Sequence, residues 1–428
     1  MPERLSISFW IFYYLFRSEK SAYHNLERCF IELKERGFNT VRVDSGAGLI
    51  HDAAGNLRGS LKFHSAFPNC RSLRQIANLS EGYCCNVLEN IIELFELAQK
   101  YDVRIILSSW FYLHTFWYVD RKIRNEFFAL PVYERFMRFA RDLSLILDEL
   151  KKRGLAQQVA FAEIFNEFEV MPAKWRMFPT DADASTQLHV MHSARRWHEE
   201  ALDFLRSRHP DMLFAIDTSA AEILRPEILP RNAQVWNRHC YFAWPVYGRV
   251  FERAVFDPDF DFASAGKDKM LAPFLKSTLT PIEKIREACG FDEEYEPGWY
   301  ARVWLYQNMR DDMLPELERR LTESFHQDTP EYRRALERYI LNSGDLHDWL
   351  LPQTLMVVGE GMTYCPLPEM RWEEKSSDYW ELVKLNANLL AKQGCLGAML
   401  RTNSGPEDPV WQEYPEKLHQ ANTAFLHG

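Results

Sequence analysis

Two glutamates that each end an apolar run carry the chemistry that this sequence suggests most directly. Residues 161–170 read F-A-E-I-F-N-E-F-E-V, so Glu167 follows Asn166 at the end of a buried-looking segment. A second glutamate, Glu360, ends the apolar run in V-V-G-E-G. Carboxyl groups whose environments push their pKa values apart can divide the work of an acid and of a base or nucleophile.

The elements that would position these glutamates follow a repeating pattern. Helical segments end in a basic turn, a glycine and a short apolar run, as in L-K-E-R-G-F-N-T-V-R-V and L-K-K-R-G-L. Cations near the helix end and a glycine cap are typical of a helix that stops before a strand. The pattern therefore predicts alternating helices and parallel strands. The expected strands are Leu5–Trp10, Phe38–Val43, Val103–Ser109, Val159–Phe165, Met212–Asp217, Val235–Tyr241, Leu355–Gly359 and Leu396–Arg401.

Eight strands alternating with helices predict an α/β fold, a (β/α)8 TIM barrel whose reactive residues lie at the carboxyl ends of the strands. That rule selects a set of candidate side chains without any alignment. Glu167 and Glu360 are the expected catalytic pair, because they would face each other across the barrel mouth as the two carboxyl groups of a glycoside hydrolase do. The expected substrate-binding residues are Arg42, Trp110, Asn166, His239, Tyr241, Trp244, Arg401 and Asn403.

The motifs at four of these strand ends resemble those of a known enzyme group. N-E after the fourth strand, H-x-Y at the sixth and G-E at the seventh, with V-R-V at the second, resemble the retaining (β/α)8 glycoside hydrolases, most closely the cellulase and mannanase family numbered five. The resemblance implies that Glu167 is the acid/base and Glu360 the nucleophile. It also implies that Asn166 binds the sugar 2-hydroxyl, that His239 lines the site, and that Arg42 and Tyr241 keep Glu360 ionised.

The sequence departs from that family at three positions. The eighth strand has no tryptophan, the third strand ends in S-S-W-F where many members have a histidine, and Phe168 follows Asn166-Glu167 where proline is usual. The absence of a signal peptide and the size resemble intracellular exo-β-mannosidase-like members. The prediction is therefore hydrolysis of β-1,4-mannosides, including mannosyl-N-acetylglucosamine. The alternatives are a β-glucosidase or endo-glucanase of the same clan, a non-catalytic carbohydrate-binding barrel and a metal-dependent barrel enzyme.

Several other polar residues have both a functional and a structural interpretation. Glu163 would point to the same side of its strand as Glu167, so we expect a buried, paired carboxylate, and we expect Glu169 to reach only solvent. Arg42 could instead form a structural ion pair with Glu163 or Asp44. Three histidines of one helix are expected on a solvated face, and two acidic residues are expected to cap the helix after Pro409. They are His189, His192 and His198, and Glu407 and Asp408.

One catalytic domain is expected over residues 1–428, with an insertion at 245–352 between the sixth and seventh strands. The insertion contains a charged helical stretch from Tyr300 to about Ile340 and is expected to act as a lid or an oligomer contact.

Charge, hydrophobicity and cysteine content limit the kinds of partner and cofactor that this protein is expected to bind. The formal net charge is -10, which disfavours nucleic acid. The apolar run Leu5–Phe16 is too short to span a bilayer and has no signal-peptide features, so neither a membrane nor export is expected. Eight scattered cysteines suggest a reducing, cytoplasmic location. With no zinc-type spacing of Cys and His, no metal or cofactor is expected.

Overall fold

The computed structural model describes most of the chain. The described residues are 3–11, 13–65, 70–71, 83–110, 115, 118–175, 177–179, 181–219, 226–241, 262, 265–289, 297–361, 367 and 369–428.

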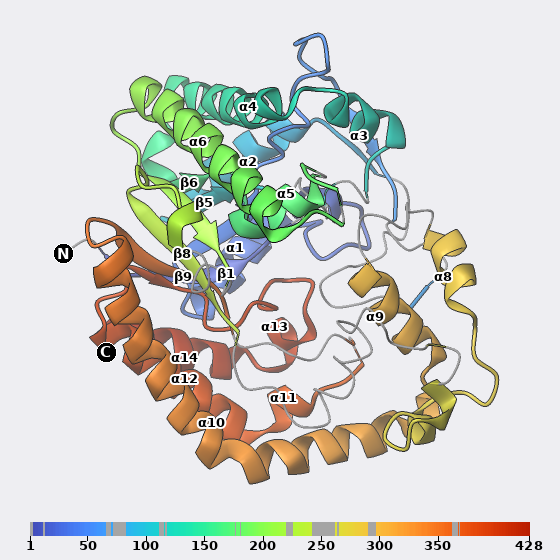
Figure 1. Ribbon diagram of the computed structural model, residues 1–428. Helices are drawn as coiled ribbons and strands as arrows, with labels where there is room; N and C mark the ends of the chain where they lie inside the picture. The colour runs from blue at the N-terminus through green and yellow to red at the C-terminus, as the bar shows by residue number, and fades with distance from the viewer. Residues whose placement is uncertain are drawn as a thin grey trace.

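Eight parallel strands close into a barrel in the order β1-β10-β9-β8-β7-β6-β5-β2, with helices around it (Figure 1). All eight predicted strands are present, with ends shifted by a few residues, and the prediction of a (β/α)8 barrel is confirmed. The barrel strands are β1 (Leu5–Phe9), β2 (Thr40–Asp44), β5 (Arg104–Ser108), β6 (Val159–Glu163), β7 (Phe214–Thr218), β8 (Val235–Cys240), β9 (Leu355–Gly361) and β10 (Gly397–Ala398).

The outer helices pack an apolar stripe on the barrel. The long ones are α1 (Leu26–Glu35), α2 (Val87–Lys100), α4 (Val132–Lys152), α6 (Ala184–Arg208), α10 (Leu314–Leu350), α12 (Ser377–Lys392) and α14 (Pro415–His427). Caps set their ends as the sequence predicts. Asn86 accepts a hydrogen bond from the Glu89 backbone N–H at the start of α2. Gly37, Gly154 and Gly394 follow α1, α4 and α12 with φ of 75°, 71° and 74°, the left-handed conformation that lets each helix stop before the next strand.

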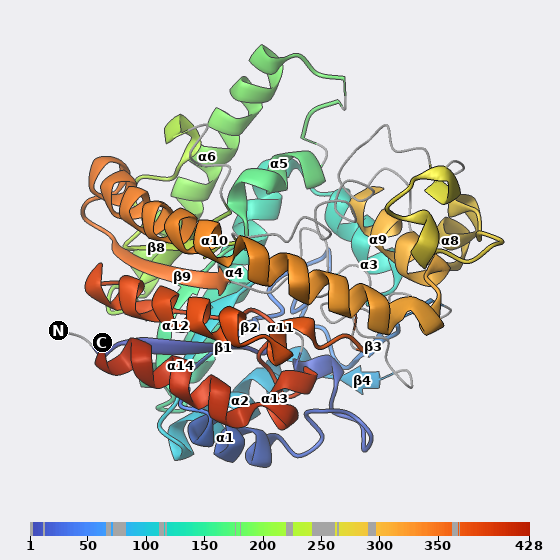
Figure 2. The same cartoon turned by 90° about the horizontal axis from the view of Figure 1, so that it is seen from below.

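Shorter strands and helices lie at the carboxyl end of the barrel. They are the antiparallel pair β3 (Leu61–Phe63) and β4 (Tyr83–Cys85), and the helices α3 (Arg121–Phe128), α5 (Met171–Lys174), α8 (Ile282–Cys289), α9 (Pro297–Asn308), α11 (Trp372–Lys375) and α13 (Pro409–Glu413). Figure 2 shows α8 and α9 beyond one end of the strands.

The segment between β8 and β9 is partly a barrel helix. The expected helical stretch from Tyr300 to about Ile340 is helical over most of its length, but it is divided between α9 and α10, and α10 continues to Leu350. The second half of α10 packs against α12, and its Tyr339 hydroxyl donates to the His239 carbonyl at 2.9 Å. This half therefore takes the place of the helix after the sixth barrel strand. A lid or oligomer contact stays a prediction.

Two further findings concern the chain as a whole. None of the described helices is both long and apolar enough to cross a membrane. The cysteines whose side chains the structure describes are free thiols, namely Cys29, Cys70, Cys84, Cys85, Cys240 and Cys395, whereas the cytoplasmic location stays a prediction.

Candidate active site

Arg42 is the centre of a charged cluster inside the mouth of the barrel. The side chain comes from the middle of β2 and is fully buried. Its Nε donates to Glu163 Oε1 at 2.9 Å, and its Nη2 donates to Asp217 Oδ2 at 2.9 Å and to Asn166 Oδ1 at 2.7 Å. Its Nη1 lies 3.1 Å from Glu360 Oε1. One guanidinium thus orders four groups from three strands or their ends, which its planar fork of five donors allows.

Glu360 is also held by Tyr241. The Tyr241 hydroxyl donates to Glu360 Oε2 and lies 3.2 Å from Thr402 Oγ1. Burial raises the pKa of Glu360 above its ordinary value, and the charges of His239 and Arg42 oppose that rise without cancelling it. The family resemblance implies that Arg42 and Tyr241 keep Glu360 ionised. The pKa of Glu360 is nevertheless raised, because taking a carboxylate out of water is the larger effect.

Glu167 emerges from the cluster on a strained turn. It directly follows Asn166 after β6 and adopts a left-handed conformation with φ of 49° and ψ of 61°, which is uncommon for a residue with a side chain. Its backbone N–H donates to Asp217 Oδ1 at 2.6 Å. Its side chain is 24% exposed, against 9% for Glu360. Glu167 is therefore the carboxyl of this cluster that is most open to solvent.

His239 lies between the two candidate catalytic glutamates. Its Nδ1 is 3.1 Å from Glu167 Oε1, and its Nε2 is 3.6 Å from Glu360 Oε1 and 3.2 Å from Asp217 Oδ1. Burial alone would lower the pKa of His239, but the negative charges of Glu360 and Asp217 outweigh it, so the pKa is well above the ordinary value. An imidazole ring bridging Glu167 and Glu360 shows that the two carboxyl groups converge on one site.

The predicted residues divide into three groups. The structure brings together Arg42, Asn166, Glu167, His239, Tyr241 and Glu360. Trp110 is at the same place but only 1% exposed, since its ring packs on the Arg42 guanidinium at 4.7 Å and on Phe9 at 5.5 Å. It therefore supports Arg42 rather than presenting an open face to a sugar. Trp244 lies outside the described residues.

Arg401 does not join this cluster. Its guanidinium pairs with Glu373 at 2.8 Å and Glu374 at 2.5 Å, and it also contacts the Tyr379 hydroxyl at 2.9 Å. The side chain is 1% exposed, so its partners are protein groups where a sugar contact was expected. Asn403 accepts from Arg401 Nε through its backbone carbonyl, and its buried Nδ2 has no hydrogen-bond partner among the described residues. A sugar contact for Asn403 stays a prediction.

Sequence reasoning missed Asp217, which is fully buried and touches Arg42, Glu167 and His239. The signal was available, because Asp217 ends one of the predicted strands, where the barrel rule places reactive residues. The prediction for Glu163 is confirmed, since it is buried and paired with Arg42 and with Asn237 Nδ2 at 2.9 Å. The alternative pair of Arg42 with Glu163 is thus present beside its contact with Glu360.

Two predictions of solvent exposure are wrong. Glu169 is 6% exposed and accepts hydrogen bonds from the backbone N–H and hydroxyl of Ser219. His198 is fully buried against Phe165 and Phe168, and burial lowers its pKa to about 3. Exposed positions are found for the other two helix histidines, His189 and His192.

The acidic pair before Pro409 has divided roles. Asp408 caps α13 by accepting from the Val410 backbone N–H at 2.9 Å, as predicted. Glu407 instead accepts from the Tyr23 hydroxyl.

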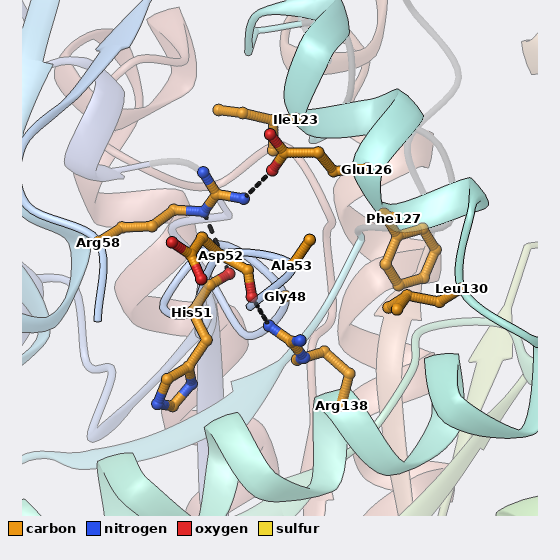
Figure 3. A pocket seen from close by; sticks show the side chains of 10 residues that line it. All are labelled: Gly48, His51, Asp52, Ala53, Arg58, Ile123, Glu126, Phe127, Leu130 and Arg138. Atoms are coloured by element: carbon orange, nitrogen blue, oxygen red, sulfur yellow. Dashed lines mark hydrogen bonds and ion pairs between the residues drawn. The ribbon is translucent and has the colours of Figure 1, made fainter. Parts of the chain in front are cut away.

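A separate pocket lies beside α3 and α4, where two arginines are already paired with protein groups (Figure 3). Arg58 forms a 2.7 Å ion pair with Glu126, and Arg138 donates to the Asp52 carbonyl at 2.5 Å. The pocket lining contains neither candidate catalytic glutamate. Within the part of the chain that the structure describes, no three His, Cys, Asp or Glu side chains are grouped to hold a metal ion.

The fold and the site define a (β/α)8 barrel with converging carboxyl groups at the carboxyl ends of its strands. A family model described as "Cellulase-like: Sugar-binding cellulase-like" matches residues 7–283. The match covers well over half of the chain, so this chain belongs to that family and has the glycoside hydrolase fold of the cellulase-like kind. Glu167 lies inside the matched range, whereas Glu360 lies beyond it.

One solved structure supports the fold, and two others are reported as similar chains only. A protein from Parabacteroides distasonis ATCC 8503, provisionally named a glycoside hydrolase, is 17% identical with a TM-score of 0.66, and the match covers 99% of this chain and 93% of that chain. A glycoside hydrolase family 5 mannosidase from Rhizomucor miehei is 12% identical with a TM-score of 0.46, covering 100% and 94%. An endo-1,4-beta-D-mannanase from Thermotoga petrophila RKU-1 is 11% identical with a TM-score of 0.43, covering 92% and 87%. No curated protein matches the sequence.

Proposed function

We propose that this protein hydrolyses β-linked oligosaccharides by a retaining, two-step mechanism, with Glu360 as nucleophile and Glu167 as acid/base. The observation that carries the proposal is the imidazole of His239, which contacts Glu167 on one side and Glu360 on the other. A retaining enzyme needs two carboxyl groups roughly 5–5.5 Å apart on either side of the bond that breaks.

The surroundings of the two glutamates suit different tasks. Glu360 meets Arg42 and the Tyr241 hydroxyl, both of which favour a carboxylate that is oriented for attack on the sugar carbon. Glu167 has a more exposed side chain, where a leaving group and then a water molecule can reach it. In the first step the bond from the sugar carbon to the leaving oxygen breaks, Glu360 bonds to that carbon, and Glu167 gives the oxygen a proton. In the second step Glu167 takes a proton from water, which displaces Glu360.

The proposed substrate is a short β-1,4-mannoside such as mannosyl-N-acetylglucosamine, cleaved from its end. Support comes from the motif resemblance and from the long segment between β8 and β9, which places α8 and α9 beyond one end of the strands (Figure 2). Such additions can narrow a cleft to a pocket. Arg42 would hold Asn166 so that its amide can meet the sugar 2-hydroxyl.

The direct test is a rate assay on aryl β-mannoside, β-glucoside, β-galactoside and β-xyloside. Hydrolysis of the mannoside by the wild-type protein is expected, and Glu360→Ala should lower the rate by roughly 10⁴-fold or more, as removal of a nucleophile does. Glu416→Ala, at an exposed helix position, is the matched control and should retain activity. Preference for another sugar would overturn the mannoside assignment alone, whereas inactivity on all four and on natural disaccharides would overturn hydrolysis.

The two roles can be separated by adding azide. In Glu360→Ala, azide can occupy the space left by the carboxylate and attack the sugar directly, which gives an α-glycosyl azide. In Glu167→Ala, azide attacks the glycosyl-enzyme and gives the β-glycosyl azide. Proton NMR of the anomeric signal distinguishes these products, and the reverse pattern would exchange the two roles.

A further inference from the structure

Asp217 occupies a position that links the candidate acid/base to the histidine beside it. It is the penultimate residue of β7, and its side chain is fully buried. Three donors from three other elements meet its carboxylate. They are the Glu167 backbone N–H at 2.6 Å, Arg42 Nη2 at 2.9 Å and His239 Nε2 at 3.2 Å.

This contact set determines which nitrogen of His239 can exchange a proton. Burial would raise the pKa of Asp217, but the charges of His239 and Arg42 outweigh it and lower the pKa, so Asp217 is a carboxylate. A carboxylate only accepts hydrogen bonds, and therefore the Nε2 that faces it carries a hydrogen. Nδ1, 3.1 Å from Glu167 Oε1, is the nitrogen left to gain or lose a proton.

The other groups around His239 also favour the protonated ring. Glu360 approaches from β9, and the ring centroid of Tyr241, which directly follows β8, lies 5.8 Å from that of the histidine. Arg42 lies behind Asp217 and Glu360, and the Tyr339 hydroxyl from α10 bonds the His239 carbonyl. Negative charge therefore surrounds the ring and opposes loss of its proton.

Asp217 also acts on the backbone that presents the acid/base. Glu167 has a left-handed conformation that costs on the order of 1–3 kcal/mol for a residue other than glycine. The short bond from its N–H to Asp217 Oδ1 offsets part of that cost. The same carboxylate thus orients both members of the Glu167–His239 pair.

We propose that Asp217 is a positioning residue that directs His239 Nδ1 at Glu167, so that the pair shares the proton delivered to the leaving oxygen. The inference rests on the proposed function. When the bond between sugar and leaving oxygen breaks and Glu360 bonds to the sugar, one proton moves from the pair to that oxygen. Water returns one proton to the pair when it displaces Glu360.

The test compares Asp217→Asn with Glu163→Gln. Both variants remove one buried negative charge that pairs with Arg42, but only Asp217 contacts His239 and the Glu167 N–H. Asp217→Asn should lower kcat by roughly 10²- to 10⁴-fold, the scale seen when a histidine loses its orienting carboxylate. It should also move the alkaline limb of kcat/KM to lower pH, because the pair loses its last proton more easily without the nearby negative charge.

Glu163→Gln should shift that limb much less, and Asp217→Glu should recover part of the rate. An alkaline limb that is unchanged in Asp217→Asn, with both variants folded by thermal melting, would reduce Asp217 to a structural ion-pair partner.

A measurement that needs no activity separates this inference from the proposed function. Histidine ¹⁵N NMR, with His239 assigned by comparison with His239→Gln, should show that His239 titrates at higher pH in the wild-type protein than in Asp217→Asn. Identical titration curves would overturn the inference. If the wild-type protein cleaves no glycoside but the curves differ, the proposed function fails while the positioning by Asp217 holds.

Discussion

Two buried arginines of this barrel, one within β2 and one after β10, are surrounded by carboxylates, yet they form different kinds of cluster. Arg42 meets Glu163, Asp217 and Glu360, whereas Arg401 meets Glu373 and Glu374. The Arg401 cluster is closed, with side-chain exposures of 1%, 0% and 0%. The Arg42 cluster opens to solvent through Glu360 and the adjoining Glu167.

The difference shows how the same ion pairs can serve packing in one place and chemistry in another. Around Arg401 the acidic groups come from α11 and secure the loop after β10. Around Arg42 the acidic groups come from barrel strands, and one of them, Glu360, remains partly exposed. Opening, rather than charge, distinguishes the candidate site.

The same substitution at both arginines tests this comparison most strongly. Arg42→Met and Arg401→Met each leave carboxylates buried without their cation, so each should lower the free energy of unfolding by about 3–5 kcal/mol. The folded fraction of Arg401→Met should retain near wild-type kcat, whereas folded Arg42→Met should be nearly inactive. Urea unfolding and activity per folded molecule measure the two effects. Equal loss of kcat in both variants would contradict the comparison.

The tyrosines of the two clusters provide a sharper pair. Tyr241→Phe removes the hydroxyl that donates to Glu360 and should lower kcat/KM by roughly 10²- to 10³-fold, as loss of one oriented donor does. Tyr379→Phe removes an oxygen that contacts Arg401 and should cost about 1 kcal/mol of stability with little change in rate. Steady-state kinetics and thermal melts separate the effects on rate and on stability. A strongly lowered rate in Tyr379→Phe would contradict the comparison, because it would show that the Arg401 cluster affects the reaction.

Glu407 extends the comparison to a partly buried carboxyl whose hydrogen-bond partner is the Tyr23 hydroxyl and not an arginine. Burial raises its pKa to about 7, and the Tyr23 hydroxyl opposes that rise. Its neutral form therefore stabilises the fold fully below about pH 4.5, and this contribution is lost as pH rises through 7. Glu407→Gln should be about 1–2 kcal/mol more stable than wild type at pH 8 and similar at pH 4.5.

Urea unfolding at the two pH values measures this difference, with Glu416→Gln at an exposed position as the control. A Glu407→Gln advantage that is the same at both pH values would show that this carboxyl is not held neutral by the fold.

Local sequence patterns predict the eight strands, and the positions of the strands in turn predict most of the charged cluster. Apolar runs, basic helix ends and glycine caps define the barrel, and the barrel then places residues such as Arg42 and Glu167 at one end. Glu169 and His198 were misplaced because their burial depends on partners distant in sequence, namely Ser219 and a group of phenylalanines.

Arg401 illustrates a limit of the strand-end rule. The rule assigns a residue to one end of the barrel, but it does not say which neighbour satisfies the side chain. The partners Glu373 and Glu374 precede Arg401 by almost thirty residues and belong to a short helix that has no distinctive pattern. Only the folded structure, in which α11 packs against α10 and α12, reveals the ion pairs of Arg401 with Glu373 and Glu374.

Thr402 joins the two regions and gives the smallest expected effect. It follows Arg401 directly and accepts from the Gly361 backbone N–H at 2.9 Å. Its one hydroxyl hydrogen can be donated to the Gly361 carbonyl, 3.0 Å away, or to the Tyr241 hydroxyl, 3.2 Å away. If Thr402 helps to direct the tyrosine hydrogen at Glu360, Thr402→Val should lower kcat/KM by up to roughly 10-fold, the worth of one hydrogen bond. The acid limb of the pH profile should move to higher pH, because the Glu360 carboxylate is less well stabilised.

Two controls keep this small effect interpretable. Thr402→Ser retains the hydroxyl and should restore the rate, while Thr354→Val removes a buried hydroxyl that donates to the Leu351 carbonyl away from the site. Thr354→Val should lower stability without moving the acid limb. If Thr402→Val also lowers stability without moving the acid limb, Thr402 does not stabilise the Glu360 carboxylate. The Arg401 cluster then has no influence on the chemistry of Glu360.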